Sequence, residues 1–154
     1  MDKLIMEDEV DDTDGAAGLA VLQRMFCEGF ETGNADIVDE LCAPDLIEHQ
    51  FGLSGSGSAA IENVKAAIRD VHRAAPDLRF TMEDWAVEHE TIWVRMRAVG
   101  TATGPFFGPP SGCHLDFAVV DVARVVDGVI AEHWGVPDRF AMLAQTGVLD
   151  RVLA

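Results

Sequence analysis

The chain has 154 residues and a mass of 16.7 kDa, the size of one domain, and its 49% hydrophobic and 25% charged residues are ordinary for a globular protein. Its 27 acidic residues outnumber its 11 lysines and arginines and give a formal net charge of −16. Because such a chain repels phosphate backbones and anionic lipid surfaces, we expect no nucleic-acid partner and no membrane partner.

The N-terminal segment and the cysteines predict where the protein works. Residues 1–15 carry seven acids and one lysine, a density of like charge that predicts an acidic mobile tail ahead of a single domain over 16–154. The segment is acidic and lacks an apolar stretch, so it does not read as a signal peptide. The three cysteines are an odd number without a CxxC motif, which argues against disulfides and a zinc site. We therefore expect a cytoplasmic protein.

The first half of the domain is predicted to be mainly helical. Apolar residues recur there at three- and four-residue steps, the spacing of a single apolar helix face. Asn34 and Ser58 are suitable N-caps. Helices are expected over 16–31, 34–43 and 58–75, with a short extended segment at 46–51.

The second half changes to an apolar period of two, which is typical of strands. Asp127 and Gly128 predict the turn of a late hairpin, and Pro137 suits the first turn of a final helix. Phe106 and Phe107, in a loop rich in glycine and proline, are expected to form a lid or, more readily, a dimer contact. Strands are expected over 78–87, 91–103, 113–126 and 129–136.

Helices followed by an antiparallel sheet predict an α+β architecture. The sheet is expected to curve around the N-terminal helices and to form a cone that they close. The apolar interior of such a cone is a natural pocket for a small molecule.

The strand over 113–126 places one carboxylate among apolar neighbours. A carboxylate on a buried face is costly unless it is paired, neutralised or used. Asp121 is therefore a candidate for moving a proton. The residues that share its face are Leu115, Phe117, Val119, Ala123 and Val125.

The partner of Asp121 depends on the hairpin register. A two-residue loop places Asp121 opposite Trp134. A three-residue loop places it opposite His133 and brings Gly135 beside Val119. We favour the three-residue loop, because a carboxylate that orients an imidazole suits general acid–base chemistry. A buried Asp–His pair with a purely structural role is the alternative.

The remaining candidate residues follow from the same pocket. His49, in the extended segment, is a third candidate catalytic residue at the mouth of the cone. No HxH, HxxxH, HExxH or GxSxG spacing occurs, so we assign no metal ligand and no serine nucleophile. The wall of the pocket and the contacts to its ligand are expected from Met25 or Phe26, Met96, Phe117, Val119 and Gly135.

Two stretches resemble the SnoaL-like polyketide cyclase family: GTATGPFFGPPSG, which begins at Gly100, and VARVVDGVIAEHWGVPDRFAMLAQTG, which ends at Gly147. That family belongs to the nuclear-transport-factor-2-like superfamily of α+β cone folds. The resemblance implies a homodimer with the ligand inside each cone. It also implies cofactor-free acid–base chemistry on a small hydrophobic, polyketide-like carbonyl compound, such as an aldol ring closure.

Three polar positions of the family differ in this chain. The family's key aspartate lies two positions after the histidine that corresponds to His133, where this chain has Gly135. The family's pocket histidine on the preceding strand corresponds to Asp121. Many relatives read GTHTG where this chain reads GTATG, so Ala102 stands in place of another histidine. Either the carboxylate has moved to Asp121, or the chain performs different chemistry, or it only binds.

These observations give two main hypotheses. The first is a cofactor-independent cyclase or isomerase in which Asp121 moves the proton, His133 orients it or acts as its acid partner, and His49 assists. The second is a non-catalytic module of the same fold that binds a small molecule or dimerises. Cofactor-free hydrolysis or hydroxylation on this scaffold is a third hypothesis.

Overall fold

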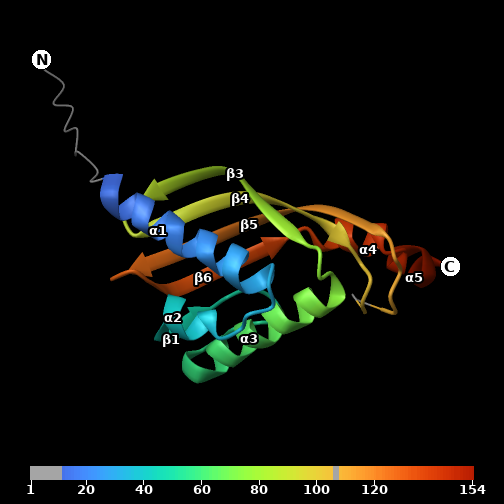
Figure 1. Ribbon diagram of the computed structural model, residues 1–154, viewed down its shortest axis with the longest axis horizontal. Helices are drawn as coiled ribbons and strands as arrows, with labels where there is room; N and C mark the ends of the chain where they lie inside the picture. The colour runs from blue at the N-terminus through green and yellow to red at the C-terminus, as the bar shows by residue number, and fades with distance from the viewer. Residues whose placement is uncertain (1–11, 106–107) are drawn as a thin grey trace, which may run out of the picture.

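The computed structural model describes residues 12–105 and 108–154, and Figure 1 shows their arrangement. The helices are α1 (Asp12–Arg24), the π-helix η1 (Met25–Phe30), α2 (Ile37–Leu41), α3 (Gly57–Ala74), α4 (Arg139–Gln145) and α5 (Val148–Leu153). The strands are β1 (Cys42–Glu48), β2 (Gly55–Ser56), β3 (Arg79–Glu88), β4 (Thr91–Thr101), β5 (His114–Val126) and β6 (Val129–Pro137). The predicted α+β class is confirmed.

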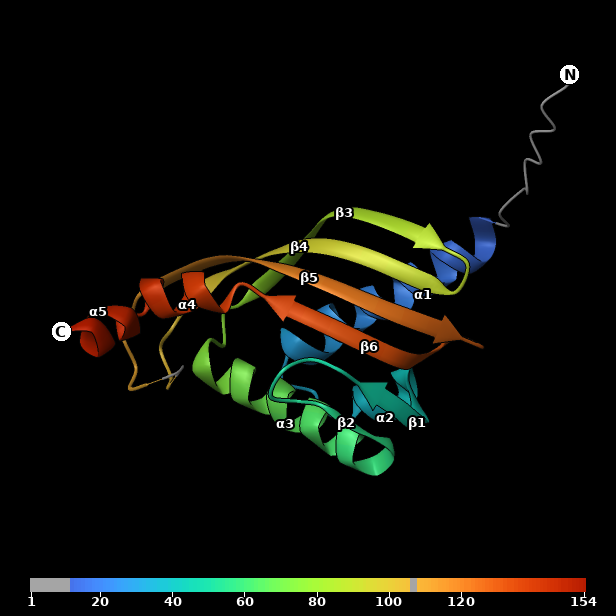
Figure 2. The ribbon, with the colours of Figure 1, turned by 180° about the vertical axis from the view of Figure 1, so that it is seen from behind.

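One six-stranded sheet carries the fold, in the order β2-β1-β6-β5-β4-β3. The strands from β3 to β6 pair antiparallel, but β1 runs parallel to β6. The sheet is therefore mixed, where the sequence predicted a wholly antiparallel one. Seen from both sides, the long strands curve, with α1 across one face and α3 beside β1 and β2 (Figures 1 and 2). This shape is consistent with a cone closed by helices.

The π-helix η1 interrupts the expected first helix and changes which side chains it buries. The N–H of Glu31 donates to the carbonyl oxygen of Phe26 at 2.9 Å, an i→i+5 hydrogen bond typical of a π-helix. Its wider turn buries the consecutive residues Met25 and Phe26 together. A regular α-helix would favour burial of only one of these two consecutive side chains.

The turn between β5 and β6 contradicts the favoured three-residue loop. Asp127 and Gly128 both have positive φ, of 50° and 79°, which matches a two-residue type I′ turn. Val126 pairs with Val129 on either side of it. The Asp-Gly dipeptide therefore adopts the turn that its sequence favours most.

A bulge then shifts the register of this hairpin by one residue. Ala131 has no partner on β5 because the pairing jumps there. As a result Asp121 lies opposite Gly135, and neither Trp134 nor His133 is its direct partner. His133 is two positions from Gly135 along β6, so its side chain projects from the same face of the sheet as that of Asp121.

The first helix begins earlier than the predicted residue 16. Helix α1 begins at Asp12, so the last residues of the expected 1–15 tail belong to a helix. The rest of that expected tail lies outside the described residues. Phe106 and Phe107, for which a lid or dimer contact was expected, also lie outside them.

The C-terminal boundary also differs. Pro137 is the last residue of β6 and does not begin the final helix. Asp138 caps α4 instead, because its carboxylate accepts a hydrogen bond from the backbone N–H of Ala141 at 2.9 Å. A further short helix, α5, follows Gly147, whose positive φ of 72° ends α4.

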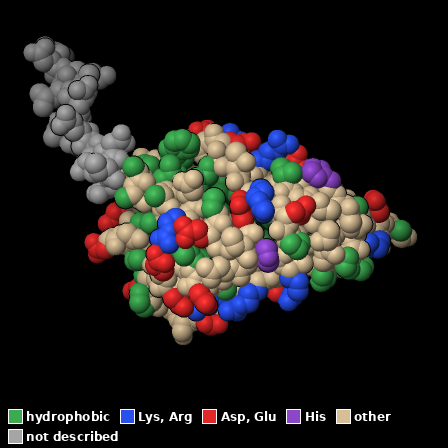
Figure 3. All heavy atoms as spheres, in the orientation of Figure 1, with side chains coloured by type: hydrophobic (Ala, Val, Ile, Leu, Met, Phe, Trp, Pro, Cys, Tyr) green, Lys and Arg blue, Asp and Glu red, His purple; other side chains and the backbone are tan. Residues whose placement is uncertain are grey.

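Basic side chains on the surface are interspersed with acidic ones on the face shown in Figure 3. Arg24 forms ion pairs with Glu28 and Glu40, and Lys65 pairs with Asp39, at 2.7 to 2.8 Å. The positive charges of Arg24 and Lys65 are thus neutralised by neighbouring carboxylates. Across the described residues, no helix combines the length and the apolar character that a membrane crossing requires.

Candidate active site

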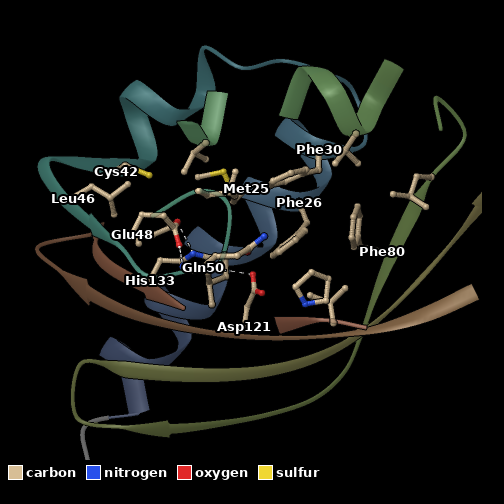
Figure 4. A pocket seen from close by; sticks show the side chains of 18 of the residues that line it. Met25, Phe26, Phe30, Cys42, Leu46, Glu48, Gln50, Phe80, Asp121 and His133 are labelled. Carbon is tan, nitrogen blue, oxygen red and sulfur yellow. Dashed lines mark hydrogen bonds and ion pairs between the residues drawn. The ribbon is translucent and has the colours of Figure 1, made fainter. Parts of the chain in front are cut away.

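A cavity opens between the curved sheet and the helices that cover it. Its empty volume is about 840 Å³, counted out to its open mouth. Most of its lining is apolar, and its acidic and imidazole side chains gather at one end (Figure 4). The residues that line it include Met25, Phe26, Phe30, Cys42, Glu48, Gln50, Phe80, Phe117, Val119, Asp121, Pro137 and His133.

Strand β5 brings Asp121 into this cavity. The residues at 115, 117, 119, 121 and 123 are buried and alternate with more exposed neighbours, as the sequence predicted. Asp121 is only 4% exposed. Its Oδ2 lies 3.1 Å from Nε2 of His133. The predicted pairing of these two side chains is therefore present, although their backbones are not directly opposite each other.

A second buried carboxylate holds the other side of the same imidazole. Oε2 of Glu48 lies 2.8 Å from Nδ1 of His133, and Glu48 is 3% exposed. The remaining oxygen of Glu48, Oε1, accepts a hydrogen bond from the backbone N–H of Gln50 at 2.7 Å. Glu48 and His133 are adjacent because β1 runs parallel to β6 and pairs these two residues.

The two carboxylates keep His133 charged. Burial disfavours the imidazolium, but the hydrogen bonds that it donates to Asp121 and Glu48, together with their negative charge, outweigh that effect and raise the pKa of His133 to about 10. At neutral pH both ring nitrogens are thus protonated, and each donates to a carboxylate. His133 has no further N–H to offer a ligand, so it positions Asp121.

One oxygen of Asp121 is left for chemistry. Oδ2 is engaged by His133, whereas Oδ1 has no hydrogen-bond partner among the residues that the structure describes. Figure 4 shows the carboxylate projecting from the sheet into the cavity. A general base needs such an oriented oxygen within reach of the proton that it removes.

The predicted wall residues divide into two groups. Met25, Phe26, Phe117 and Val119 line the cavity, as expected. Met96 does not: it is completely buried and packs within the hydrophobic core, on a strand against which α1 lies. Its strand neighbour Val119 forms the wall instead.

Gly135 does not line the cavity either, because another side chain covers it. A Cβ atom added at Gly135 would lie 1.9 Å from Oε1 of Gln50. The amide of Gln50 therefore occupies the space that a side chain at position 135 would fill.

The structure places His49 away from the cavity. Side chains alternate along β1, so His49 projects from the opposite side to Glu48. Its ring stacks on Trp134 with centroids 4.6 Å apart, and its Nε2 lies 2.9 Å from Oε1 of Glu132. The side chain of His49 is 39% exposed. The imidazole of His49 is therefore directed away from Asp121. Only its backbone approaches the site, where its N–H donates to the carbonyl oxygen of His133 at 2.9 Å.

Glu48 and Gln50 are the polar cavity residues that the sequence analysis missed. Leu46 is buried and Ile47 is 39% exposed, so the residues of β1 that face inward are 46 and 48. The inward alternation then continues to Gln50. Because Leu46 and Ile47 are both apolar, the sequence alone does not indicate whether the face of Leu46 and Glu48 or the face of Ile47 and His49 is the buried one.

Aromatic side chains form the opposite part of the cavity from the carboxylates. The ring centroids of Phe26 and Phe80 are 4.9 Å apart, and those of Phe26 and Phe30 are 5.6 Å apart. Such a cluster offers flat apolar surfaces to a ligand. The cavity thus joins an aromatic region to an acidic one.

The donor set does not favour a metal ion. Among the described residues, no group of three or more His, Cys, Asp and Glu side chains has an arrangement that could hold one. Cys42 lines the cavity, but burial and the nearby Glu48 raise the pKa of its thiol to about 12. The thiol is therefore neutral at physiological pH.

The chain belongs to the SnoaL-like polyketide cyclase family, whose model matches residues 20–146. It is similar to TsrD from Streptomyces laurentii, with 26% identity over 90% of this chain and 98% of that one and a TM-score of 0.73. It is also similar to IdmH, a candidate polyketide cyclase from Streptomyces antibioticus, with 28% identity over 84% and 98% of the two chains and a TM-score of 0.71.

A more distant structure shares the fold alone. It is a protein of ketosteroid isomerase-like fold from Catenulispora acidiphila, 13% identical over 82% of this chain and 92% of that one, with a TM-score of 0.65. No curated protein matches the chain. The family that the sequence resembles is thus confirmed, and its cone-type fold with it.

The charge on His133 predicts a pH dependence of stability. Its pKa of about 10 in the folded chain exceeds the ordinary value of 6.5, so folding strengthens proton binding. This contribution to stability is complete below about pH 6.5 and is lost as the pH rises through about 10. We expect the free energy of unfolding in urea to fall over that window. In Asp121→Asn the fall should move to lower pH, because one carboxylate no longer holds the proton.

An exposed histidine provides the control for this experiment. His114→Asn changes a histidine on the surface and should leave the shape of the profile unchanged. A free energy of unfolding that stays level between about pH 6.5 and 10 would contradict the prediction. So would a profile for Asp121→Asn that matches the unsubstituted protein.

Proposed function

We propose that this chain is a cofactor-independent cyclase or isomerase that acts on a small hydrophobic, polyketide-like carbonyl compound. In this proposal Asp121 carries the proton and is the catalytic residue, and His133 and Glu48 are positioning residues. The observation that supports it most directly is a buried carboxylate with one oxygen anchored by an imidazolium and the other free in an apolar cavity.

The proposed reaction begins with proton transfer from carbon. Oδ1 of Asp121 takes a proton from the carbon next to a carbonyl group. The C–H electron pair becomes a C=C bond, and the carbonyl π pair moves to oxygen, which gives an enolate. In a cyclase, the enolate carbon forms a C–C bond to a second carbonyl carbon of the same molecule, and Asp121 returns its proton to the new alkoxide. In an isomerase, the proton returns to a different carbon.

The position of Asp121 supports this proposal. In the family that the sequence resembles, the key aspartate lies at the position that Gly135 occupies in this chain. In this chain Asp121 is the direct cross-strand partner of Gly135. A carboxylate transferred between these two positions stays at the same level of the sheet and on the same face. This geometry supports the hypothesis that Asp121 performs the role that the family's aspartate performs at the position of Gly135.

The shape of the cavity supports an aromatic or polycyclic substrate. The cluster of Phe26, Phe30 and Phe80 can contact the faces of a ring system, while Asp121 lies at the acidic end. A ligand that spans both regions would place a carbonyl-bearing end near Asp121 and its rings against the phenylalanines. Orientation of this kind contributes strongly to rate.

The test follows deuterium uptake by 2-acetylnaphthalene, a bicyclic aryl ketone, in D₂O with mass spectrometry. The protein should accelerate exchange of the hydrogens next to the carbonyl. Asp121→Asn should lower that rate by about 10²- to 10⁴-fold, the usual contribution of a general base. Asp116→Asn is the matched control, since Asp116 lies on the same strand but pairs with Arg97 on the outer side, and it should retain the rate.

The results separate the catalytic proposal from its alternative. Equal exchange rates in Asp121→Asn and the unsubstituted protein would remove Asp121 from the mechanism. If ligand-observed NMR detects binding of the ketone but no variant or wild-type chain accelerates its exchange, the non-catalytic binding module is the better description.

We also propose that the chain forms a homodimer through the outer face of the sheet. Trp93 and Trp134 both pair with Val122 and so form one row across three strands, and they are 48% and 36% exposed. An ion pair between Arg95 and Glu83 lies beside this row. Exposed aromatic and arginine side chains are the composition of protein interfaces.

Sedimentation equilibrium tests this assembly. The wild-type chain should have the mass of a dimer, and Trp93→Glu should give a monomer, because it replaces one tryptophan of this apolar row with a charge. The control is Phe51→Glu, which changes an aromatic residue that is 83% exposed and lies outside this row. A monomeric wild type would refute the proposal.

A further inference from the structure

The proposed proton transfer needs a hydrogen-bond donor for the substrate carbonyl oxygen, and neither Asp121, His133 nor Glu48 can supply one. When a proton leaves carbon, negative charge develops on the carbonyl oxygen, and a hydrogen-bond donor aimed at that oxygen lowers the barrier. Both N–H groups of His133 are already committed to Glu48 and Asp121. The carboxylates of those two residues can only accept. The thiol of Cys42 is a weak donor.

Gln50 carries a free amide at this end of the cavity. Its side chain lines the cavity, and its carboxamide has no hydrogen-bond partner among the described residues. The carboxamide lies over Gly135, which is directly opposite Asp121 across the ladder. Figure 4 shows Gln50, Asp121 and His133 at the same end of the cavity, with the Gln50 side chain reaching into it.

Hydrogen bonds fix the backbone of Gln50 at this end of the cavity. Its N–H donates to Oε1 of Glu48, and its carbonyl oxygen accepts from the N–H of Leu53 at 2.9 Å. The same residue is therefore anchored to the Glu48–His133–Asp121 chain and presents two unused donors beside it. A donor held in advance needs little reorganisation as charge develops.

We propose that the side-chain amide of Gln50 donates a hydrogen bond to the substrate carbonyl oxygen whose negative charge grows as Asp121 removes the neighbouring proton. This inference rests on the proposed function and adds the electrophilic partner of Asp121. It also gives Gly135 a role: the absence of a side chain there leaves the space through which the Gln50 amide reaches the substrate.

The experiment measures whether the amide contacts a bound carbonyl. 2-Acetylnaphthalene labelled with ¹³C at the carbonyl is bound to the protein, and its carbonyl stretch is recorded by isotope-edited infrared spectroscopy. A hydrogen bond lowers this frequency, so the stretch should lie lower in wild type than in Gln50→Met, which keeps the length of the side chain but has no N–H. Gln50→Met should also weaken binding of the ketone about fivefold and slow its exchange about 10²-fold.

The hydrocarbon 2-ethylnaphthalene separates this contact from general packing. It has the same ring system without the oxygen, so Gln50→Met should leave its affinity unchanged. A loss of affinity for both ligands would show that Gln50 acts only by packing and would overturn the inference.

A second variant tests the geometry without removing the glutamine. Gly135→Ala places a Cβ where the Gln50 carboxamide now lies, so the amide must move. The backbone at position 135 does not have a positive φ, and alanine is therefore compatible with it. We expect Gly135→Ala to raise the carbonyl frequency toward that of Gln50→Met. The control is Gln23→Met, an exposed glutamine on α1, which should behave as wild type.

The outcomes also distinguish this inference from the proposed function. A low carbonyl frequency in wild type and in Asp121→Asn, lost in Gln50→Met, supports the inference even if no chain exchanges the ketone, in which case the proposed function alone fails. Identical frequencies in wild type and Gln50→Met would overturn the inference while exchange by Asp121 could persist. Failure of the wild type to bind either naphthalene would contradict both.

Discussion

A charged imidazole held between two buried carboxylates is the interaction on which this site depends. Removing one member of a buried ion pair costs about 3–5 kcal/mol, because the remaining charge is left without compensation. Glu48, His133 and Asp121 therefore require one another. The imidazolium fixes one oxygen of Asp121 and leaves the other without a described partner in a largely apolar cavity. A carboxylate oriented in this way is suited to acid–base chemistry.

The sheet builds this arrangement from three irregular features. The parallel pairing of β1 with β6 sets Glu48 beside His133. The bulge at Ala131 places Asp121 opposite a glycine while His133 remains within hydrogen-bond distance on the same face. The π-helix adds two adjacent apolar side chains to the wall. Bulges and π-helices often occur at functional sites, and here they adjust where side chains meet.

The regular elements of the fold could be predicted from the sequence, whereas the bulge and the pairing of distant strands could not. Strict alternation along 113–126 was enough to put Asp121 inside, because its neighbours on that face are all apolar. The favoured three-residue loop placed Asp121 opposite His133, two residues from its actual partner Gly135. The choice of turn accounts for one of these residues, and the bulge at Ala131, which nothing in the sequence marks, accounts for the other. Glu48 was missed in favour of His49 because pairing with β6, a contact between distant segments, decides which of the two faces inward.

Nitrogen NMR of the His133 side chain measures directly whether this imidazole is charged. ¹⁵N chemical shifts distinguish an imidazolium, with two protonated nitrogens, from a neutral ring with one. We predict that both nitrogens of His133 show imidazolium shifts at neutral pH and that the ring loses its proton only near pH 10. A neutral His133 at pH 7, with one unprotonated nitrogen, would contradict the claim that two carboxylates hold it charged.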